Sequence, residues 1–398
     1  MADPRVVVSG LGAVSPYGAG VKALWTGLSS GVTAIRPATA IDTDGLRARI
    51  AAEVPAEALD GLGVSRRRSR ADRMAIAAAA EALSDAGVGA GDRVGAALLV
   101  GAVGGGMYEA EEWYWSRRTP SDRDRRALRS LLPTAHADAL AARFGICGPR
   151  ETLVMACASG AASIALAADL IRDGVVDVAL AGGVDSLTRV CFMGFNALKL
   201  VDPEPCRPFD RGRRGMSVGE AAAFVVLEAA DRCRARGGRA YAELAGAAMT
   251  TDAHHVTAPH PEGEGMIRAM SLALAAAHVA PAEIDYVNAH GTGTPVNDSI
   301  EALALARVFD GATPLVSASK SLIGHAMAAA GSVEAVATIL AMCHGLVPPT
   351  ANLVDVDPAM PFDCVPGTAR PAVVETALSN SFGFGGQNVS LVFRRNAD

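Results

Sequence analysis

The chain has 398 residues, half of them hydrophobic, and its 36 basic and 42 acidic side chains give a formal net charge of −6. This length is more than one hydrophobic core usually holds, so we expect two domains or one large α/β body. The acidic balance argues against a general nucleic-acid-binding protein, and no uninterrupted apolar run is long enough to cross a bilayer.

Short apolar runs alternate with helical patterns along the chain, which predicts an α/β fold. In the first half, the expected strands cover residues 6–8, 97–100, 153–155, 178–181 and 222–227, and the expected helices cover residues 70–86, 133–144 and 161–172. In the second half, the expected strands cover residues 240–244, 284–287, 315–317, 377–380 and 389–393, and the expected helices cover residues 264–278, 299–309 and 328–344. The order of elements restarts around residues 231–239, so we expect one α/β unit to be duplicated.

The cysteines favour a reducing environment. The chain has seven of them, an odd number, and no two are spaced as Cys-x-x-Cys. This argues against a disulfide framework and against a cysteine-based zinc site. The first residues also lack the basic and apolar regions of a secretory signal. We therefore expect a soluble, cytoplasmic protein, with a metabolic enzyme as the default class.

One cysteine lies where a strand turns sharply into a helix. Cys157 follows the apolar run 152–155 and precedes the helical run 161–171. A thiol at a helix N-terminus faces the positive end of the helix dipole and free backbone N–H groups. We therefore expect a lowered pKa and a usable nucleophile. A small, buried, apolar cysteine is the alternative when this residue is taken alone.

Three later turns carry further candidate catalytic groups. His290 follows a strand in a Gly/Thr turn, and His325 follows Lys320 by five residues in a strand–turn–helix segment, with Glu334 further along that helix. The glycine-rich turn around Phe384 allows backbone N–H groups to approach a reacting oxygen, as an oxyanion hole requires. One cysteine and two histidines suggest thiol chemistry on an acyl group, with the histidines donating N–H groups to a thioester enolate.

Two other motifs point to different chemistry. Gly10 and Gly12 resemble a dinucleotide-binding fingerprint, but its third glycine is absent and Pro16 follows at once. His254 and His255 have no third ligand at a suitable spacing, so we expect no metal site.

Two basic clusters occur on this acidic chain. One covers residues 65–73, and the other consists of Arg117, Arg118, Arg123, Arg125, Arg126 and Arg129. Each is compatible with a solvated helix start, and together they favour docking of an acidic partner.

Six motifs in one order resemble those of the β-ketoacyl-acyl carrier protein synthases, the condensing enzymes of the thiolase superfamily, and most closely the type II form. They are Ala156-Cys-Ala-Ser-Gly160, Arg207-Pro-Phe-Asp210, Gly219-Glu220, Asn288-Ala-His-Gly-Thr-Gly-Thr294, Lys320-Ser-Leu-Ile-Gly-His325 and Asn380-Ser-Phe-Gly-Phe-Gly-Gly386. The resemblance covers nearly the whole chain. It implies an α/β thiolase fold, with duplicated βαβαβαββ halves in a five-layered αβαβα sandwich. We expect residues 1–235 to carry the nucleophilic cysteine and residues 236–398 to carry the two histidines.

The resemblance implies a decarboxylative Claisen condensation. Cys157 would accept an acyl chain from acyl carrier protein, and the enolate left when malonyl-acyl carrier protein loses CO2 would attack the Cys157 thioester. His290 and His325 would bind the malonyl thioester oxygen through protonated Nε2 atoms, and Lys320 would hold His325. The product is β-ketoacyl-acyl carrier protein. No cofactor is implied beyond the phosphopantetheine that arrives on the carrier protein.

The resemblance also assigns supporting roles. The backbone N–H groups of Cys157 and Phe384 would form the oxyanion hole, and Phe384 matches a gate between the two half-reactions. The remaining matches are Thr292, Thr294 and Thr257 for pantetheine binding, Glu334 for support behind the histidines, Phe195 for the acyl-pocket wall and Lys199 for carrier-protein docking.

One departure from the family pattern bears on the substrate. Gly104 aligns with a position that is bulky in the housekeeping enzyme, so the acyl channel would lose a wall residue. We therefore expect longer, stiffer or more unsaturated chains. This favours the catalytic ketosynthase subunit of a type II polyketide or polyene synthase, although homodimer and heterodimer with a chain-length-factor homologue both remain open.

Three alternatives remain. The first is housekeeping fatty acid elongation as a homodimer. The second is a thiolase, which would use a second cysteine in the C-terminal glycine turn, whereas Cys364 precedes that turn. The third is a non-catalytic subunit resembling a chain-length factor, against which the presence of Cys157, His290 and His325 argues.

Overall fold

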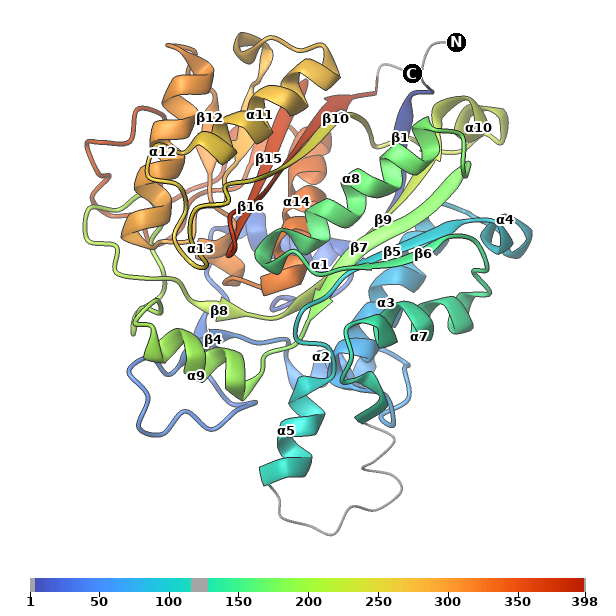
Figure 1. Cartoon of the computed structure of the whole chain (residues 1–398), viewed down its shortest axis with the longest axis horizontal. Helices are drawn as coiled ribbons and strands as arrows, with labels where there is room; N and C mark the ends of the chain where they lie inside the picture. The colour runs from blue at the N-terminus through green and yellow to red at the C-terminus, as the bar shows by residue number, and fades with distance from the viewer. Residues whose placement is uncertain (1–3, 116–127, 397–398) are drawn as a thin grey trace.

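A single mixed sheet of eleven strands crosses the whole molecule (Figure 1). The computed structural model describes residues 4–115 and 128–396. The sheet runs in the order β12–β11–β15–β16–β10–β1–β9–β7–β5–β6, with β2 paired to β1. Its strands are β1 (Val6–Ser15), β2 (Gly18–Ala19), β5 (Ala97–Gly101), β6 (Arg150–Leu153), β7 (Val178–Asp185), β9 (Ala221–Ala229), β10 (Ala242–Thr251), β11 (Tyr286–Asn288), β12 (Leu315–Ser317), β15 (Thr376–Gly383) and β16 (Gln387–Arg395).

The two halves of this sheet have the same strand order. Apart from the short β2, each half contributes five strands to the sheet. When these strands are numbered in chain order, both halves run third, second, fourth, fifth, first from the outer edge towards the middle. The two first strands, β1 and β10, lie side by side. These two strands pair antiparallel over Val7 with Glu243 and Val8 with Ala242. The restart of the pattern that the sequence indicates therefore corresponds to a repeated topology.

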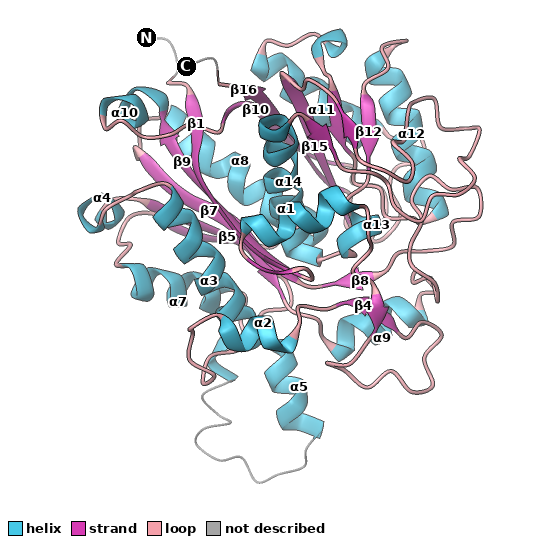
Figure 2. Ribbon diagram, turned by 180° about the vertical axis from the view of Figure 1, so that it is seen from behind, coloured by secondary structure: helices cyan, strands magenta, loops and turns pink. Residues whose placement is uncertain are grey.

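Two helices lie between the halves, and others, among them α3 and α11, cover the outer faces (Figures 1 and 2). Helices α8 and α14 contact each other and strands of both halves, α3 and α7 pack on the first half, and α11 packs on the second half beside α12. The helices are α1 (Val21–Ser30), α2 (Ala56–Gly61), α3 (Arg70–Asp85), α4 (Ala90–Val94), α5 (Met107–Trp115), α7 (Thr134–Phe144), α8 (Ser159–Arg172), α9 (Arg189–Ala197), α10 (Ala230–Ala235), α11 (Glu264–Ala277), α12 (Pro295–Phe309), α13 (Lys320–Ile323) and α14 (Ala330–His344).

Short elements complete the fold. Small strands are β3 (Arg36–Pro37), β4 (Ile50–Ala52), β8 (Val218–Gly219), β13 (Leu346–Val347) and β14 (Arg370–Pro371), and 3-10 turns are η1 (Leu128–Ser130), η2 (Ala156–Ala158), η3 (Pro281–Glu283) and η4 (Met327–Ala329). Two of these turns, η2 and η4, directly precede the central helices α8 and α14. The turns that carry reactive groups are thus anchored to the most buried layer of the molecule.

The central helices are apolar because they have no solvent face. Helix α14 is buried along nearly its whole length, from Ala330 to Met342. Within the described part of the chain, the segment Met327–His344 is long and apolar enough to cross a membrane, but 89% of it is buried inside the protein. A helix that is apolar all round and enclosed in this way is a core helix.

Gly10 and Gly12 let a helix approach the sheet closely. A Cβ atom at Gly12 would lie 1.9 Å from the Ala78 carbonyl oxygen, and one at Gly10 would lie 2.2 Å from the Ala82 carbonyl oxygen. Both carbonyls belong to α3, which packs on β1. Close packing of α3 on β1 therefore explains the fingerprint-like spacing of these glycines.

The predicted elements are present, with differences at their ends. The strand expected over residues 153–155 is displaced, because β6 covers Arg150–Leu153 and shares only Leu153 with the prediction. Helix α12 begins at Pro295, four residues before the expected start. Proline is favoured in the first helical turn, where its missing N–H costs no hydrogen bond.

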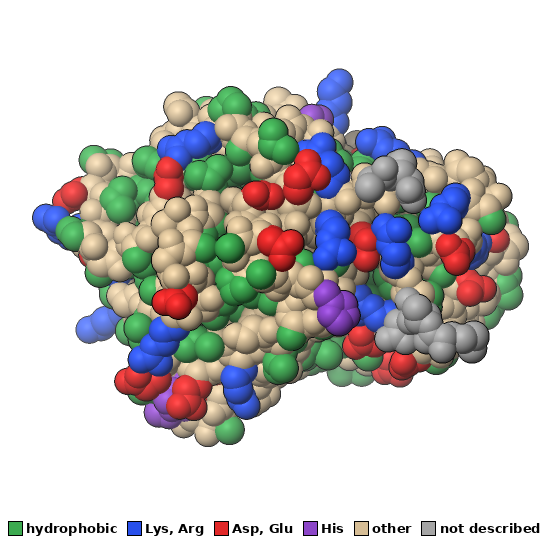
Figure 3. All heavy atoms as spheres, turned by 90° about the horizontal axis from the view of Figure 1, so that it is seen from above, with side chains coloured by type: hydrophobic (Ala, Val, Ile, Leu, Met, Phe, Trp, Pro, Cys, Tyr) green, Lys and Arg blue, Asp and Glu red, His purple; other side chains and the backbone are tan. Residues whose placement is uncertain are grey.

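Acidic and basic side chains are interspersed over the face that carries α11 and α12 (Figure 3). This face therefore does not present one continuous basic surface.

Candidate active site

Cys157 lies in a tight turn between β6 and α8. Ala156 has a φ of 46°, in the left-handed region. The Ser159 hydroxyl accepts the Met155 N–H at 2.8 Å and donates to the Ala156 carbonyl at 2.7 Å. A Cβ atom at Gly383 would lie 3.0 Å from the Met155 carbonyl oxygen and 3.1 Å from the Cys157 nitrogen. The end of β15 therefore packs closely against the backbone that carries the thiol.

The electrostatic environment of Cys157 differs from the sequence-based expectation. Burial raises the pKa of the thiol to about 11, and the carboxylates of Asp185 and Glu334 add to this effect. The Lys320 charge and a hydrogen bond from the Phe384 N–H act in the opposite direction. The expected lowering of the pKa is therefore wrong, because desolvation of the thiolate outweighs the stabilising groups.

His290 is held by a buried lysine. The Lys320 ammonium donates to the His290 carbonyl at 2.6 Å and lies 3.2 Å from His290 Nδ1. It also contacts the Glu334 carboxylate at 2.5 Å, and both charged side chains are fully buried. Because an ammonium has only donors, His290 Nδ1 accepts, which leaves its proton on Nε2.

His325 is fixed by its own turn. Its Nδ1 atom accepts the Met327 N–H at 3.1 Å. The proton therefore lies on Nε2, as in His290. The two imidazole rings have centroids 5.5 Å apart and are nearly perpendicular, at 86°. Lys320 makes its hydrogen bonds to His290 and Glu334, so the expectation that it holds His325 directly is wrong; it acts on His325 only through its charge.

Both histidines are neutral donors at physiological pH. Burial and the nearby Lys320 charge hold the pKa of His290 and of His325 well below the ordinary value of 6.5. Burial raises the pKa of Glu334 to about 7, although Lys320 opposes this shift. Two uncharged imidazoles with Nε2–H groups can stabilise an oxyanion without first losing or gaining a proton.

Two buried carboxylates that the sequence analysis missed hold the His290 loop. Glu301 accepts the N–H groups of His290 and Gly291, both at 2.8 Å. Asp298 accepts the Gly293 N–H at 3.2 Å and the Phe209 N–H at 3.1 Å. Both acids lie in the first turns of α12, directly after the Gly/Thr turn. Acidic residues at the start of a helix that follows a catalytic loop are the signal that could have revealed them.

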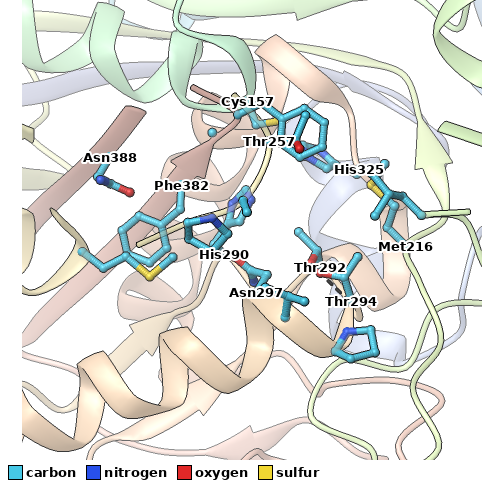
Figure 4. Close-up of a pocket in the computed structure, with 18 of the residues that line it drawn as sticks. Cys157, Met216, Thr257, His290, Thr292, Thr294, Asn297, His325, Phe382 and Asn388 are labelled. Atoms are coloured by element: carbon cyan, nitrogen blue, oxygen red, sulfur yellow. Dashed lines mark hydrogen bonds between the residues drawn. The ribbon is translucent and has the colours of Figure 1, made fainter. Parts of the chain in front are cut away.

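A cavity of about 280 Å³ brings most of the expected site residues together (Figure 4). His290 lies at its centre, with Cys157, Thr257 and His325 along one side and Thr292 and Thr294 along another. Of the expected residues, those lining the cavity are Cys157, Phe195, Thr257, His290, Thr292, Thr294, His325 and Phe384. The rings of Phe195 and Phe384 meet edge to face, with centroids 6.1 Å apart.

Four expected residues lie away from the cavity surface. Lys320 and Glu334 are buried behind the histidines. Gly104 is also buried, and its N–H donates to Asp185 at 2.7 Å. Lys199 is exposed at the end of α9, next to Leu200, which lines the cavity.

Several arginines of the basic cluster at residues 65–73 form ion pairs and hydrogen bonds within the protein. Arg70 pairs with the fully buried Glu220, Arg66 contacts Asp60, and Arg73 donates to the Leu59 carbonyl. In the second cluster only Arg129 belongs to the described residues, and the other five arginines lie outside them.

Comparison with known proteins identifies the family. The model described as "Beta-ketoacyl synthase, N-terminal domain" matches residues 3–232, and the model described as "Beta-ketoacyl synthase, C-terminal domain" matches residues 241–354. The chain belongs to the β-ketoacyl synthase family. The two matches together imply the thiolase fold.

Relatives with these domains span nearly the whole chain. The chain is 41% identical to a Streptomyces cyaneus protein that carries the name "Putative polyketide beta-ketoacyl synthase 1", over 96% of each chain. It is 39% identical to the 3-oxoacyl-acyl-carrier-protein synthase 2 of Rhizobium meliloti, over 98% of this chain and 99% of that one. The protein is therefore a transferase that forms a 3-oxoacyl-acyl carrier protein by condensation, in fatty acid or type II polyketide synthesis.

Solved structures agree with this assignment. The ishigamide ketosynthase/chain length factor superposes with a TM-score of 0.92 at 36% identity, covering 100% of both chains. A type II polyketide ketosynthase in complex with its acyl-carrier protein, AntDE:AntF, superposes with a TM-score of 0.89 at 27% identity, over 99% of this chain and 100% of that one.

Proposed function

We propose that this β-ketoacyl synthase is the catalytic ketosynthase subunit of a type II polyketide or polyene system, with Cys157 as the acyl-carrying nucleophile. One observation carries this proposal: a single apolar cavity presents the Cys157 thiol together with the Nε2–H groups of His290 and His325. The similarity to the ishigamide ketosynthase/chain length factor and to the Streptomyces cyaneus protein supports the pathway.

In the first half-reaction, the Cys157 sulfur attacks the thioester carbonyl of an acyl-carrier protein. The sulfur loses its proton, its bond to the acyl carbon forms, and the pantetheine thiolate leaves and takes up a proton. The backbone N–H groups of Cys157 and Phe384 would bind the oxyanion of the tetrahedral intermediate, and the hydrogen bond of the Phe384 N–H to the sulfur supports this role.

In the second half-reaction, malonyl-acyl carrier protein loses CO2. The electron pair of the broken carbon–carbon bond forms an enolate, whose oxygen receives hydrogen bonds from His290 and His325. The enolate carbon then attacks the Cys157 thioester, the carbon–sulfur bond breaks, and the cysteine is released as thiolate, which takes up a proton. Neutral imidazoles suit this step because they donate without competing for the proton.

The mouth of the cavity fits a pantetheine arm. The hydroxyls of Thr292 and Thr294 lie 2.9 Å apart, and Thr257 lies across the cavity from them. We assign these three threonines to pantetheine binding, Phe195 to the acyl wall and Phe384 to the gate. Lys199 is a candidate for carrier-protein docking because its side chain is exposed beside the cavity. Such docking would take place in the cytoplasm.

We also propose that the two halves, residues 1–235 and 236–398, are copies of one βαβαβαββ unit arranged as a five-layered αβαβα sandwich. The repeated strand order and the position of α8 and α14 between the halves support this.

Two observations bear on the alternatives. The 39% identity to the Rhizobium meliloti enzyme keeps housekeeping elongation by a homodimer as the second candidate. Gly104, the basis of the long-chain hypothesis, lies beside Asp185 and not on the cavity surface, so it would act on a deeper part of the acyl channel.

Turnover of radiolabelled malonyl-acyl carrier protein tests the proposal. We expect wild-type protein, alone or with a chain-length-factor homologue, to release CO2 and form β-ketoacyl product. Cys157→Ala should abolish condensation, whereas Cys343→Ala, which removes an exposed cysteine, should leave it unchanged. Wild-type protein that neither decarboxylates nor condenses, with or without a partner, would contradict the catalytic role.

A further inference from the structure

Asp185 is a buried carboxylate that no step above uses. It ends β7 and its side chain is fully buried. One carboxylate oxygen accepts the Gly104 N–H at 2.7 Å and the Val103 N–H at 3.4 Å, and the other accepts the Ala328 N–H at 2.9 Å. Asp185 has no cationic partner among the hydrogen bonds and ion pairs of the described residues, so backbone N–H groups are what stabilise it in the interior.

The hydrogen bond from the Ala328 N–H reaches the turn that orients His325. Ala328 follows Met327, whose N–H group fixes the His325 tautomer. Met327 has a φ of 49°, in the left-handed region that a residue with a side chain rarely adopts. A backbone in this conformation persists only where its surroundings hold it.

The same turn is clamped on its other side by two glycines. A Cβ atom at Gly160 would lie 2.7 Å from the Ala328 carbonyl oxygen, and one at Gly183 would lie 2.8 Å from it. The backbone of Ala328 is therefore held on both sides: its carbonyl packs closely against Gly160 and Gly183, and its N–H donates to Asp185. The packing sets the position of the turn, and the hydrogen bond to Asp185 sets its orientation.

Asp185 also acts on the nucleophile through its charge. It is among the groups that raise the pKa of the Cys157 thiol. Removal of this charge would therefore favour the thiolate of Cys157. Disordering of the His325 turn would instead slow the step at the malonyl thioester.

We propose that Asp185 is a positioning residue for His325, holding the Met327–Ala329 turn in the geometry in which the imidazole presents Nε2–H to the malonyl thioester. This inference rests on the role of His325 in the proposed function. Asp185 touches no reacting atom. Through its hydrogen bond to the Gly104 N–H, Asp185 also links the His325 turn to the loop at Gly104, so a displacement of that loop would change the position of His325.

The variant Asp185→Asn tests this proposal because it should slow decarboxylation, through the loss of His325 positioning, and speed alkylation of Cys157, through the loss of a negative charge. An amide has one acceptor oxygen, so either the Val103 and Gly104 N–H groups or the Ala328 N–H group faces an NH2 group and loses its acceptor. We expect malonyl-acyl carrier protein decarboxylation to fall about tenfold or more, while alkylation of Cys157 by iodoacetamide at pH 7 becomes faster by about threefold. In protein labelled with nitrogen-15 histidine, the His325 signals should move from the pure Nε2–H tautomer towards a mixture.

Glu81→Gln is the matched control. Glu81 is also a carboxylate that bridges two chain segments, since it accepts the Ala13 and Val21 N–H groups at 2.9 Å each, but it lies on α3 away from the cavity. We expect this variant to lose stability while leaving the decarboxylation rate and the His325 signals unchanged.

Parallel loss of decarboxylation and alkylation in Asp185→Asn, or an unchanged His325 tautomer, would overturn the proposal. If Asp185→Asn does not fold, Asp185→Ser, which keeps one acceptor in less volume, is measured in the same way and decides. Failure of the wild-type protein to decarboxylate malonyl-acyl carrier protein would instead contradict the proposed function itself.

Discussion

At the scale of single residues, the histidines of this site donate hydrogen bonds but do not deprotonate the thiol, two tasks that a cysteine–histidine enzyme often combines. The histidines do not act as bases towards Cys157 in their resting state, because each already carries its proton on Nε2 and has a pKa well below 6.5. Lys320 supplies the positive charge instead, shared between the His290 loop and Glu334. The thiol is consequently protonated at rest, and its reactivity depends on how far Lys320 and the Phe384 N–H offset burial.

This arrangement sets the pH dependence of Cys157 alkylation. Because the thiol pKa is raised to about 11, the thiolate fraction grows about tenfold per pH unit throughout the range below that value. We expect the rate of iodoacetamide labelling at Cys157, followed by peptide mass spectrometry, to increase about a hundredfold between pH 7 and pH 9. Lys320→Met should shift the profile to higher pH, since the positive charge is lost. A rate that levels off by pH 8 would contradict a raised pKa.

At the scale of elements, the site depends on close contact between the last strand pair and the nucleophile turn. The sequence predicts the turns that carry Cys157, His290 and His325, because each follows a buried apolar run. It does not predict which turns touch. The contact of Gly383 with the Cys157 backbone joins segments more than a hundred residues apart. The pairing of Lys320 with His290 and Glu334 spans shorter separations but depends on how three elements pack, and local patterns encode neither contact.

Gly383→Ala tests the contact between β15 and η2. The added Cβ atom would lie 3.0 Å from the Met155 carbonyl oxygen, a backbone atom that cannot move without shifting Cys157. We expect acylation of Cys157 by acyl-carrier protein to slow by about tenfold, because a displaced nucleophile misses the oxyanion hole. Gly91→Ala is the control, since nothing lies within 4 Å of a Cβ atom there. Equal acylation rates in the two variants would show that the turn tolerates the displacement.

At the scale of the whole molecule, the sequence predicts the architecture better than the assembly. The predicted alternation of strands and helices is confirmed by the mixed α/β structure, and the repeated strand order agrees with the restart in the second half. Apolar patterning is sufficient for this because each layer must bury its apolar face. The choice between a homodimer and a heterodimer is not encoded in such a pattern, since both use the same kind of exposed surface.

The edge strand β6 is the surface on which we expect a partner to bind. Among the described residues β6 pairs only with β5, and Val154, directly after it, is 60% exposed. The free backbone groups of an edge strand, together with the exposed apolar side chain of Val154 beside it, favour pairing with another chain. We expect Val154→Glu to weaken association about tenfold or more, measured by native mass spectrometry with and without a co-expressed chain-length-factor homologue. Val373→Glu, at a residue that is 73% exposed elsewhere on the surface, should leave association unchanged. Equal association of the two variants would place the partner on another face.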